Sequence, residues 1–71
     1  MIKPYQLEAL RKAYPAGTRV ELICMDDPYG KLKMGDRGTV KDIDDIGTVF
    51  CSWDNGSSLG LLYGIDRYRK V

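Results

Sequence analysis

The chain has 71 residues, which is enough for one domain, and we expect residues 1–71 to form a single domain. Apolar residues make up 44% of the chain and charged residues 30%, as is ordinary for a globular protein. No run approaches the roughly 18 apolar residues of a membrane-spanning helix. The first residues, Met1 to Pro4, lack the apolar stretch of a secretory signal. We therefore expect a cytoplasmic protein with no membrane partner.

The net charge of +1 is unevenly distributed. Residues 1–23 carry a net charge of +2, residues 24–66 carry −4 and residues 67–71 carry +3. A nucleic-acid-binding module normally shows a basic stripe on its binding face. Here the middle of the chain is acidic and both ends are basic, so nucleic acid is not the favoured partner.

Residues 4–14, PYQLEALRKAY, are expected to form a helix. Pro4 suits the first helical position. Leu7, Leu10 and Tyr14 recur at helical spacing and define one apolar stripe. A helix of about 11 residues is marginal alone, so this one must pack on the rest of the chain or on a partner.

Residues 18–71 are predicted to form a small SH3-like five-stranded barrel, which makes the protein mainly β with an N-terminal α-helix. Short alternating segments separated by Gly-, Asp- and Asn-containing turns carry this prediction. The expected strands are 19–25, 36–43, 48–53, 58–62 and 67–71.

Alternation along the strands predicts which side chains enter the core. Val40 and Ile43 share a face only if their strand bulges near Lys41 or Asp42. The side chains expected to point inward from the first and third strands are Val20, Leu22, Cys24, Val49, Cys51 and Trp53. In this interpretation Trp53 anchors the core. Asn55-Gly56 predicts a type I′ hairpin turn, in which both central residues take a positive φ.

Nothing in the sequence indicates catalysis. The chain has no histidine, so no Ser-His or Cys-His pair can form. Cys24 and Cys51 are expected to be small buried hydrophobes, and two cysteines are too few for an ordinary zinc site. Residues 42–47 superficially resemble a calcium loop, but apolar residues stand at ligand positions. We expect no enzymatic activity, no metal and no cofactor.

The segments GTRV, GDRGTV, GTVFCSWDNG and YGIDRY, within residues 17–68, resemble the mind-bomb type of SH3-like domain. The segments MDDPY, at 25–29, and WDNGSSLGL, at 53–61, are similar to a family of short bacterial, phage and mobile-element proteins of unknown function. The second resemblance extends over nearly the whole chain. It implies a fold and brings no known activity.

The most polar candidate contact surface combines two loops. Asp26, Asp27 and Tyr29 lie in the first loop, and Asp54 and Asn55 lie in the Asn-Gly turn. If the loops meet at one end of the barrel, they offer acceptors and an aromatic ring to a basic peptide. The alternative is ordinary turn chemistry, in which these side chains bond to their own backbone.

The aromatic residues offer further candidates: Tyr29, Phe50, Trp53, Tyr63 and Tyr68 either line a groove or fill the barrel and cap its ends. Phe50 is on the outward face of its strand. Either the helix covers it, or it belongs to an interface with a partner or with a second copy of the chain. A small homo-oligomer and a monomer both remain open.

The last residues, Arg67 to Lys70, interleave basic and aromatic side chains as nucleic-acid contacts do. The alternative is a solvated last strand whose cations pair with nearby aspartates. Taken together, these features predict a non-catalytic protein-binding module, of phage or mobile-element origin, that acts on a host or element-encoded protein. The alternative is a nucleic-acid-associated SH3-like barrel that uses its basic termini.

Overall fold

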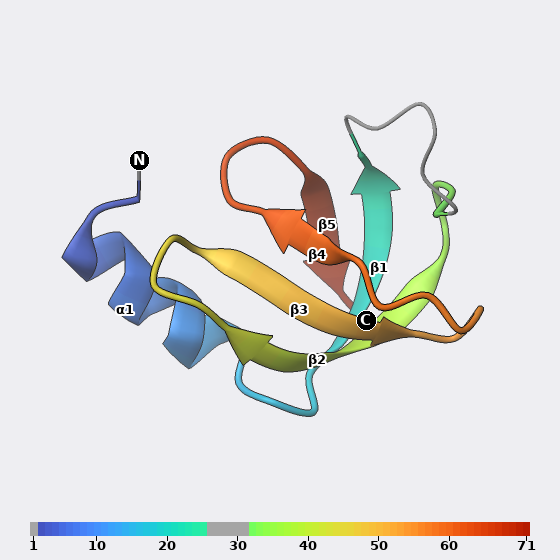
Figure 1. The fold of residues 1–71 in the computed structure, drawn as a ribbon, viewed down its shortest axis with the longest axis horizontal. Helices are drawn as coiled ribbons and strands as arrows, with labels where there is room; N and C mark the ends of the chain where they lie inside the picture. Colours follow the sequence, from blue (N-terminus) through green and yellow to red (C-terminus); the bar gives the residue numbers. More distant parts are fainter. Residues whose placement is uncertain (1, 26–31) are drawn as a thin grey trace.

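The computed structural model describes residues 2–25 and 32–71, and these contain one helix and five strands (Figure 1). The elements are α1 Pro4–Ala13, β1 Arg19–Cys24, β2 Arg37–Ile43, β3 Thr48–Trp53, β4 Gly60–Leu62 and β5 Arg67–Lys70. The predicted mainly β fold with an N-terminal helix is confirmed. Each predicted element is present within two residues of its expected bounds.

The five strands form one antiparallel sheet in the order β4-β3-β2-β1-β5. β4 and β5 are therefore the two edges of the sheet, yet only residues 63–66 separate them in the chain. A connection this short spans at most roughly 17 Å. The sheet must therefore curl until its edges approach each other, which gives an SH3-like barrel that stays open between β4 and β5, because these two strands do not pair (Figure 1).

The core lies inside the curled sheet, where the inward faces of the strands meet. Val20, Val49 and Leu61 have no exposed surface, and Cys51 is 2% exposed. Trp53 is 3% exposed, and its Nε1 donates a hydrogen bond to a backbone carbonyl at 2.9 Å. The predicted inward register of the third strand is confirmed.

The bulge predicted in the second strand is present. Val40 lies opposite Cys51, but the next pair joins Asp42 to Phe50, so one residue of β2 is extra. Val40 and Ile43 are both buried as a result. Their three-residue spacing, which conflicts with strict alternation, indicated this irregularity correctly.

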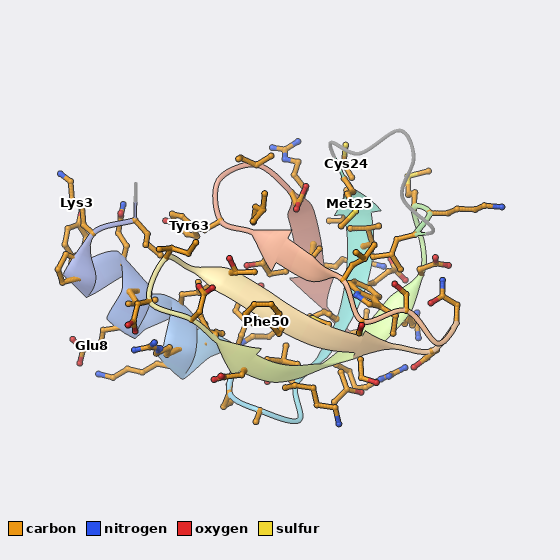
Figure 2. The ribbon with its side chains drawn as sticks, viewed as in Figure 1. Lys3, Glu8, Cys24, Met25, Phe50 and Tyr63 are labelled. Atoms are coloured by element: carbon orange, nitrogen blue, oxygen red, sulfur yellow. The ribbon has the colours of Figure 1, made fainter. Side chains whose placement is uncertain are left out.

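The prediction that Cys24 points inward is wrong. Leu22 lies opposite Tyr68 and Cys24 lies opposite Arg67, so the register of β1 shifts at Ile23. Beyond this bulge the alternation is reversed, and Cys24 is exposed (Figure 2).

The turn after β3 also differs from the prediction. No non-glycine residue described by the structure has a positive φ, so Asn55 does not take the conformation that a type I′ turn requires. Gly56 alone has a φ of 91°. The Gly56 N–H donates to the Trp53 carbonyl and the Trp53 N–H donates to the Ser57 carbonyl, both at 2.9 Å. The loop therefore holds three residues and ends on a left-handed glycine, the next commonest hairpin.

Helix α1 packs on the barrel. Leu10 is buried in the core cluster, and Leu7 and Tyr14 pack against it. Arg11 Nη2 donates to the Ile43 carbonyl at 3.1 Å and pairs with Asp45 Oδ1 at 3.0 Å. These contacts fix the helix beside the turn between β2 and β3 (Figure 1).

Candidate functional site

The contact surface expected from the two polar loops is described only in part. Asp26, Asp27 and Tyr29 lie outside the described residues. Asp54 accepts hydrogen bonds from both Arg19 terminal nitrogens, at 2.8 and 2.7 Å. This bidentate pairing lowers the pKa of Asp54 and raises that of Arg19.

Asn55 also contributes to its own turn. Its Oδ1 accepts a hydrogen bond from the Ser57 N–H at 2.9 Å, which is an Asx turn. Asn55 Nδ2 lies 3.5 Å from Asp36 Oδ2. The side chains of Asp54 and Asn55 are thus bonded within the barrel itself. For this half of the two-loop surface, the contacts fit the alternative in which the polar side chains stabilise their own turns.

Phe50 lies on the outer face of β3 and is 41% exposed (Figure 2). Its ring packs beside Gly60 of β4, the residue directly opposite. Leu7 and Leu10 of the helix are instead directed at the core. Phe50 therefore keeps an exposed aromatic surface on the outside of the sheet.

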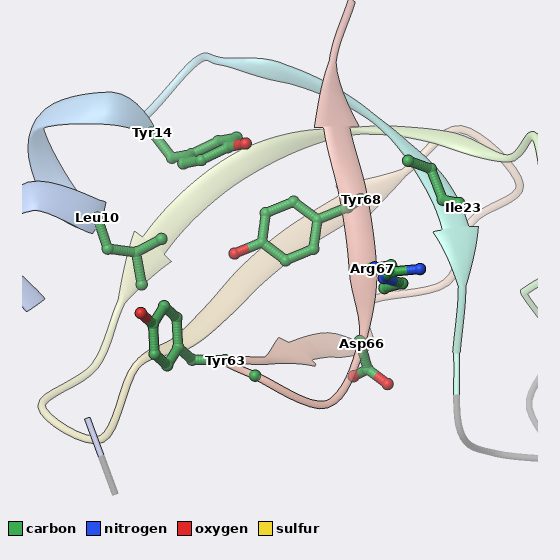
Figure 3. A pocket seen from close by; sticks show the side chains of 8 residues that line it. Leu10, Tyr14, Ile23, Tyr63, Asp66, Arg67 and Tyr68 are labelled. Atoms are coloured by element: carbon green, nitrogen blue, oxygen red, sulfur yellow. The ribbon is translucent and has the colours of Figure 1, made fainter. Parts of the chain in front are cut away.

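A second site, which we call the tyrosine pocket, lies between the end of α1, the turn from β4 to β5, and β5 itself (Figure 3). It has a volume of about 480 Å³. Its lining residues are Leu10, Tyr14, Ile23, Tyr63, Gly64, Asp66, Arg67 and Tyr68.

Three tyrosines from three elements give the pocket its character. Tyr14 caps the C-terminus of α1, Tyr63 follows β4 and Tyr68 lies on β5. The rings of Tyr14 and Tyr68 meet edge to face, with centroids 5.3 Å apart. Lys70 Nζ lies 5.2 Å from the centroid of the Tyr14 ring. The floor of the pocket is thus a fixed aromatic pair with a cation at one side.

The lining of the pocket also contains polar groups. The Tyr68 phenol is protonated at neutral pH, as tyrosine ordinarily is, and burial raises its pKa further, to about 12. Asp66 Oδ2 accepts the Leu62 N–H at 2.8 Å and so helps to close the turn from β4 to β5. Arg67 is exposed at the rim. Tyr63 and Ile23 are each 40% exposed, so the pocket keeps exposed apolar surface.

A smaller hollow of about 390 Å³ lies on the other side of Tyr63, which lines both spaces. Its remaining walls are Ile2, Gln6, Ile46, Thr48, Leu62 and Ile65. Helix α1 contributes residues to both hollows, Gln6 to this one and Leu10 and Tyr14 to the tyrosine pocket. Tyr63 is therefore the lining residue that the two hollows share.

The basic last strand is only partly available for contacts. Arg69 Nη2 pairs with Glu21 Oε2 at 2.9 Å, and Arg37 Nε pairs with Glu21 Oε1 at 3.2 Å. These bonds, chiefly those from Arg69, lower the pKa of Glu21. The Tyr68 ring is packed against Tyr14.

Sequence reasoning named Tyr63 and Tyr68 as groove or cap residues and missed the part played by Tyr14 and Ile23. In the sequence, Tyr14 belongs to the apolar stripe of the helix, and the alternation of the first strand places Ile23 on its outward face. Only the topology brings the helix end, the β4–β5 turn and the last strand together. The strand order of an SH3-like barrel is the one signal that indicates this neighbourhood.

Other kinds of site are less supported. Within residues 2–25 and 32–71, no group of three or more cysteine and carboxylate side chains is placed to hold a metal ion. Cys51 is buried, which raises the pKa of its thiol to about 11. No helix of the described chain is long and apolar enough to cross a membrane.

Neither the curated proteins nor the solved structures include a match to this chain. A family model does match: it covers residues 3–71 and is described as a domain of unknown function, DUF4314. The match spans nearly the whole chain, and the protein therefore belongs to the DUF4314 family.

Proposed function

We propose that this domain is a non-catalytic protein-binding module whose main contact site is the tyrosine pocket. The observation that carries the proposal is an open pocket whose lining combines three tyrosines and two aliphatic side chains with an aspartate and an arginine. Tyrosine is enriched in protein interfaces because its ring is large and rigid and its hydroxyl forms hydrogen bonds. A pocket of this kind suits one apolar or aromatic side chain of a partner.

The absence of histidine from the sequence supports a binding role over catalysis. Asp66 is the one carboxylate in the pocket lining, and it is already engaged by a backbone N–H of its own turn. A general base held in this way is poorly placed to take a proton from a substrate.

The nucleic-acid alternative has less support from the geometry. Of the cations near the end of the chain, Arg69 is paired with Glu21, and the Tyr68 ring packs on Tyr14 instead of facing outward for base stacking. Lys70 lies over the Tyr14 ring, and near the other terminus Arg11 is paired with Asp45 and Lys12 with Glu8. Few cations therefore remain for a phosphate-binding surface.

The two resemblances found in the sequence define the expected biology of the proposal. Similarity to short bacterial, phage and mobile-element proteins makes a host or element-encoded protein the expected partner, met in the cytoplasm. The resemblance to mind-bomb-type SH3-like domains belongs to the same proposal and is consistent with the strand order. Affinity capture from the native cell would identify the partner.

The proposal is tested by selecting peptides from a displayed random library on the whole chain and measuring their affinity for variants. Tyr63→Ala should weaken the selected peptides by about tenfold or more, since truncating an aromatic anchor commonly costs at least 1–2 kcal/mol. Tyr5→Ala is the matched control, because Tyr5 is 66% exposed and does not line the pocket. Circular dichroism would verify that both variants fold.

Equal affinity for wild type and Tyr63→Ala would remove the tyrosine pocket as the contact site. Two further variants then decide between the remaining predicted surfaces. Alanine at Asp26, Asp27 and Tyr29 together tests the first loop, and Phe50→Ala tests the outer face of β3. If no variant changes the binding, or no peptide is enriched, the proposed peptide-binding function is wrong.

A further inference from the structure

β5 offers a free strand edge beside the tyrosine pocket. It is the last strand of the sheet and pairs only with β1 within the described chain. The Val71 N–H donates to the Arg19 carbonyl at 3.1 Å. Because Val20 lies opposite Lys70, the same register places Arg19 opposite Val71. Hydrogen-bonded and non-bonded pairs alternate along an antiparallel ladder. Tyr68 and Lys70 therefore direct their backbone N–H and C=O groups away from β1.

The free edge lies on the pocket side of the strand. In Figure 3, Ile23 of β1 lies on one side of β5, whereas Leu10, Tyr14 and Tyr63 lie on the other. Tyr68 both lines the pocket and belongs to the edge. A chain added along this edge would run past the opening of the pocket.

The other edge of the sheet is less available. The Leu62 N–H of β4 donates to Asp66 Oδ2 at 2.8 Å. The Leu62 carbonyl accepts from the N–H groups of Ile65, at 3.2 Å, and Asp66, at 3.0 Å. The backbone of Leu62 is thus satisfied within its own turn, which leaves β5 as the better template for an added strand.

The charges on β5 indicate which kind of segment could pair with its free edge. The strand carries Arg67, Arg69 and Lys70. Two copies meeting through this edge would bring three cations against three cations, so charge repulsion opposes self-pairing. Glu21 pairs with Arg69, and Arg67 and Lys70 leave the strand with an excess of positive charge that an acidic segment would complement.

We propose that the partner segment binds as an additional strand on the free edge of β5, in an extended conformation with acidic and apolar residues in alternation. Arg67 and Arg69 are on the outer face of β5, and Tyr68 is on the inner face, opposite the buried Leu22. Arg69 is already paired with Glu21, so acidic side chains of the added strand would meet chiefly the exposed Arg67, and an apolar side chain would enter the tyrosine pocket. Main-chain hydrogen bonds provide affinity in this mode, and the pocket provides specificity. The inference rests on the proposed protein-binding function and specifies its ligand.

The probe is the peptide acetyl-Ser-Glu-Leu-Glu-Leu-Glu-Ser-amide, measured against the whole chain by titration calorimetry. Lys70→Pro removes an N–H that faces the free edge, and an edge strand tolerates proline at such a position. Lys70→Gln is the matched control, since it removes the same charge and keeps the N–H. We expect Lys70→Pro to bind the peptide about tenfold more weakly than Lys70→Gln does. A peptide with lysine in place of glutamate should bind wild type at least about tenfold more weakly.

A peptide-side variant keeps the test independent of whether Lys70→Pro folds. N-methylation of a peptide residue whose N–H faces β5 should abolish binding, whereas N-methylation of the next residue should not, because alternate N–H groups face away. Equal effects at adjacent positions would refute strand addition. If Tyr63→Ala weakens the library-selected peptides while every edge variant binds normally, the pocket function stands and the strand-addition inference is wrong.

Two further outcomes would overturn the inference. One is the absence of binding between the glutamate peptide and wild type at roughly 1 mM, which corresponds to a binding free energy weaker than about −4 kcal/mol. The other is tighter binding of a single-stranded oligothymidylate, with an affinity that falls steeply with salt and with Arg67→Gln. That result would assign the basic edge to phosphate contacts.

Discussion

The two cysteine thiols occupy opposite environments, and this difference is visible in their chemistry. Cys24 is exposed, whereas Cys51 is 2% exposed and burial raises its pKa to about 11. The thiolate is the reactive form. We therefore expect iodoacetamide at pH 8 to label Cys24 in the native protein and to label Cys51 only when the protein unfolds. Mass spectrometry with and without urea would measure this.

Cys24→Ser is the control for that experiment. It should leave the native protein almost unlabelled, and urea should then expose a single reactive thiol. Rapid native labelling of Cys51 would show that the inner face of β3 is not closed, and the register assigned to that strand would have to change.

Gly38 is the clearest case in which one strand depends on its neighbour. It lies directly opposite Trp53, and a Cβ at this position would approach the indole Cε3 to 2.9 Å and the Ser52 carbonyl oxygen to 3.1 Å. Because one of these neighbours is backbone, the clash cannot be relieved by a side-chain rotation alone. We expect Gly38→Ala to lower the free energy of unfolding by about 1–3 kcal/mol, measured by urea denaturation.

Ser52→Ala, an exposed change on the neighbouring strand, should alter the free energy of unfolding by less than about 0.5 kcal/mol. If Gly38→Ala were as neutral as Ser52→Ala, the close packing of the indole on β2 would be contradicted. In that case the core anchored by Trp53 would be looser than the structure indicates.

At the scale of the elements, local pattern was sufficient wherever the inward face was distinct from the outward one. The bulge in β2 was predictable because Val40 and Ile43 cannot share a face without it. The bulge in β1 was not, because Leu22, Ile23 and Cys24 are all apolar and no spacing marks the extra residue. The three-residue loop that ends at Gly56 was not predicted, for a related reason. Asn-Gly is compatible with both a two-residue and a three-residue hairpin loop, and the pairing with the next strand decides between them.

At the scale of the whole molecule, the curled sheet explains why the site was harder to predict than the fold. The tyrosine pocket joins the end of α1 to the last strand, and residues 14 and 68 meet only when the barrel closes. Sequence periodicity reports on each strand separately. It carries no information about which side chains meet across the open end of the barrel.

Closure also sets how stability depends on pH. Glu21 holds β2 and β5 beside β1 through two arginines, and Asp54 holds the β3 turn to β1. Both carboxyls have a folded-state pKa below their usual values of 4.5 and 3.8. Near these values the unfolded chain binds more protons than the folded one. The stability that the ion pairs of Glu21 and Asp54 contribute is therefore fully present above about pH 5 and is lost as the pH falls through the folded-state pKa values.

The alkaline side has the opposite sign and a different cause. Burial raises the pKa of Cys51 from 9.0 to about 11 and that of Tyr68 from 10.0 to about 12. The folded protein keeps protons that the unfolded chain releases. The stability contributed by these two buried groups is therefore fully present below about pH 9 and is lost as the pH rises toward 12.

We expect the urea midpoint to be flat between about pH 5 and 9 and to fall on both sides. Glu21→Gln should flatten the acid side, and Tyr68→Phe should recover stability on the order of 2 kcal/mol of the alkaline loss. Tyr5→Phe is the matched control, because the Tyr5 phenol is exposed on the helix. If Tyr68→Phe left the alkaline side unchanged, the partial burial of the Tyr68 phenol against Tyr14 would be contradicted.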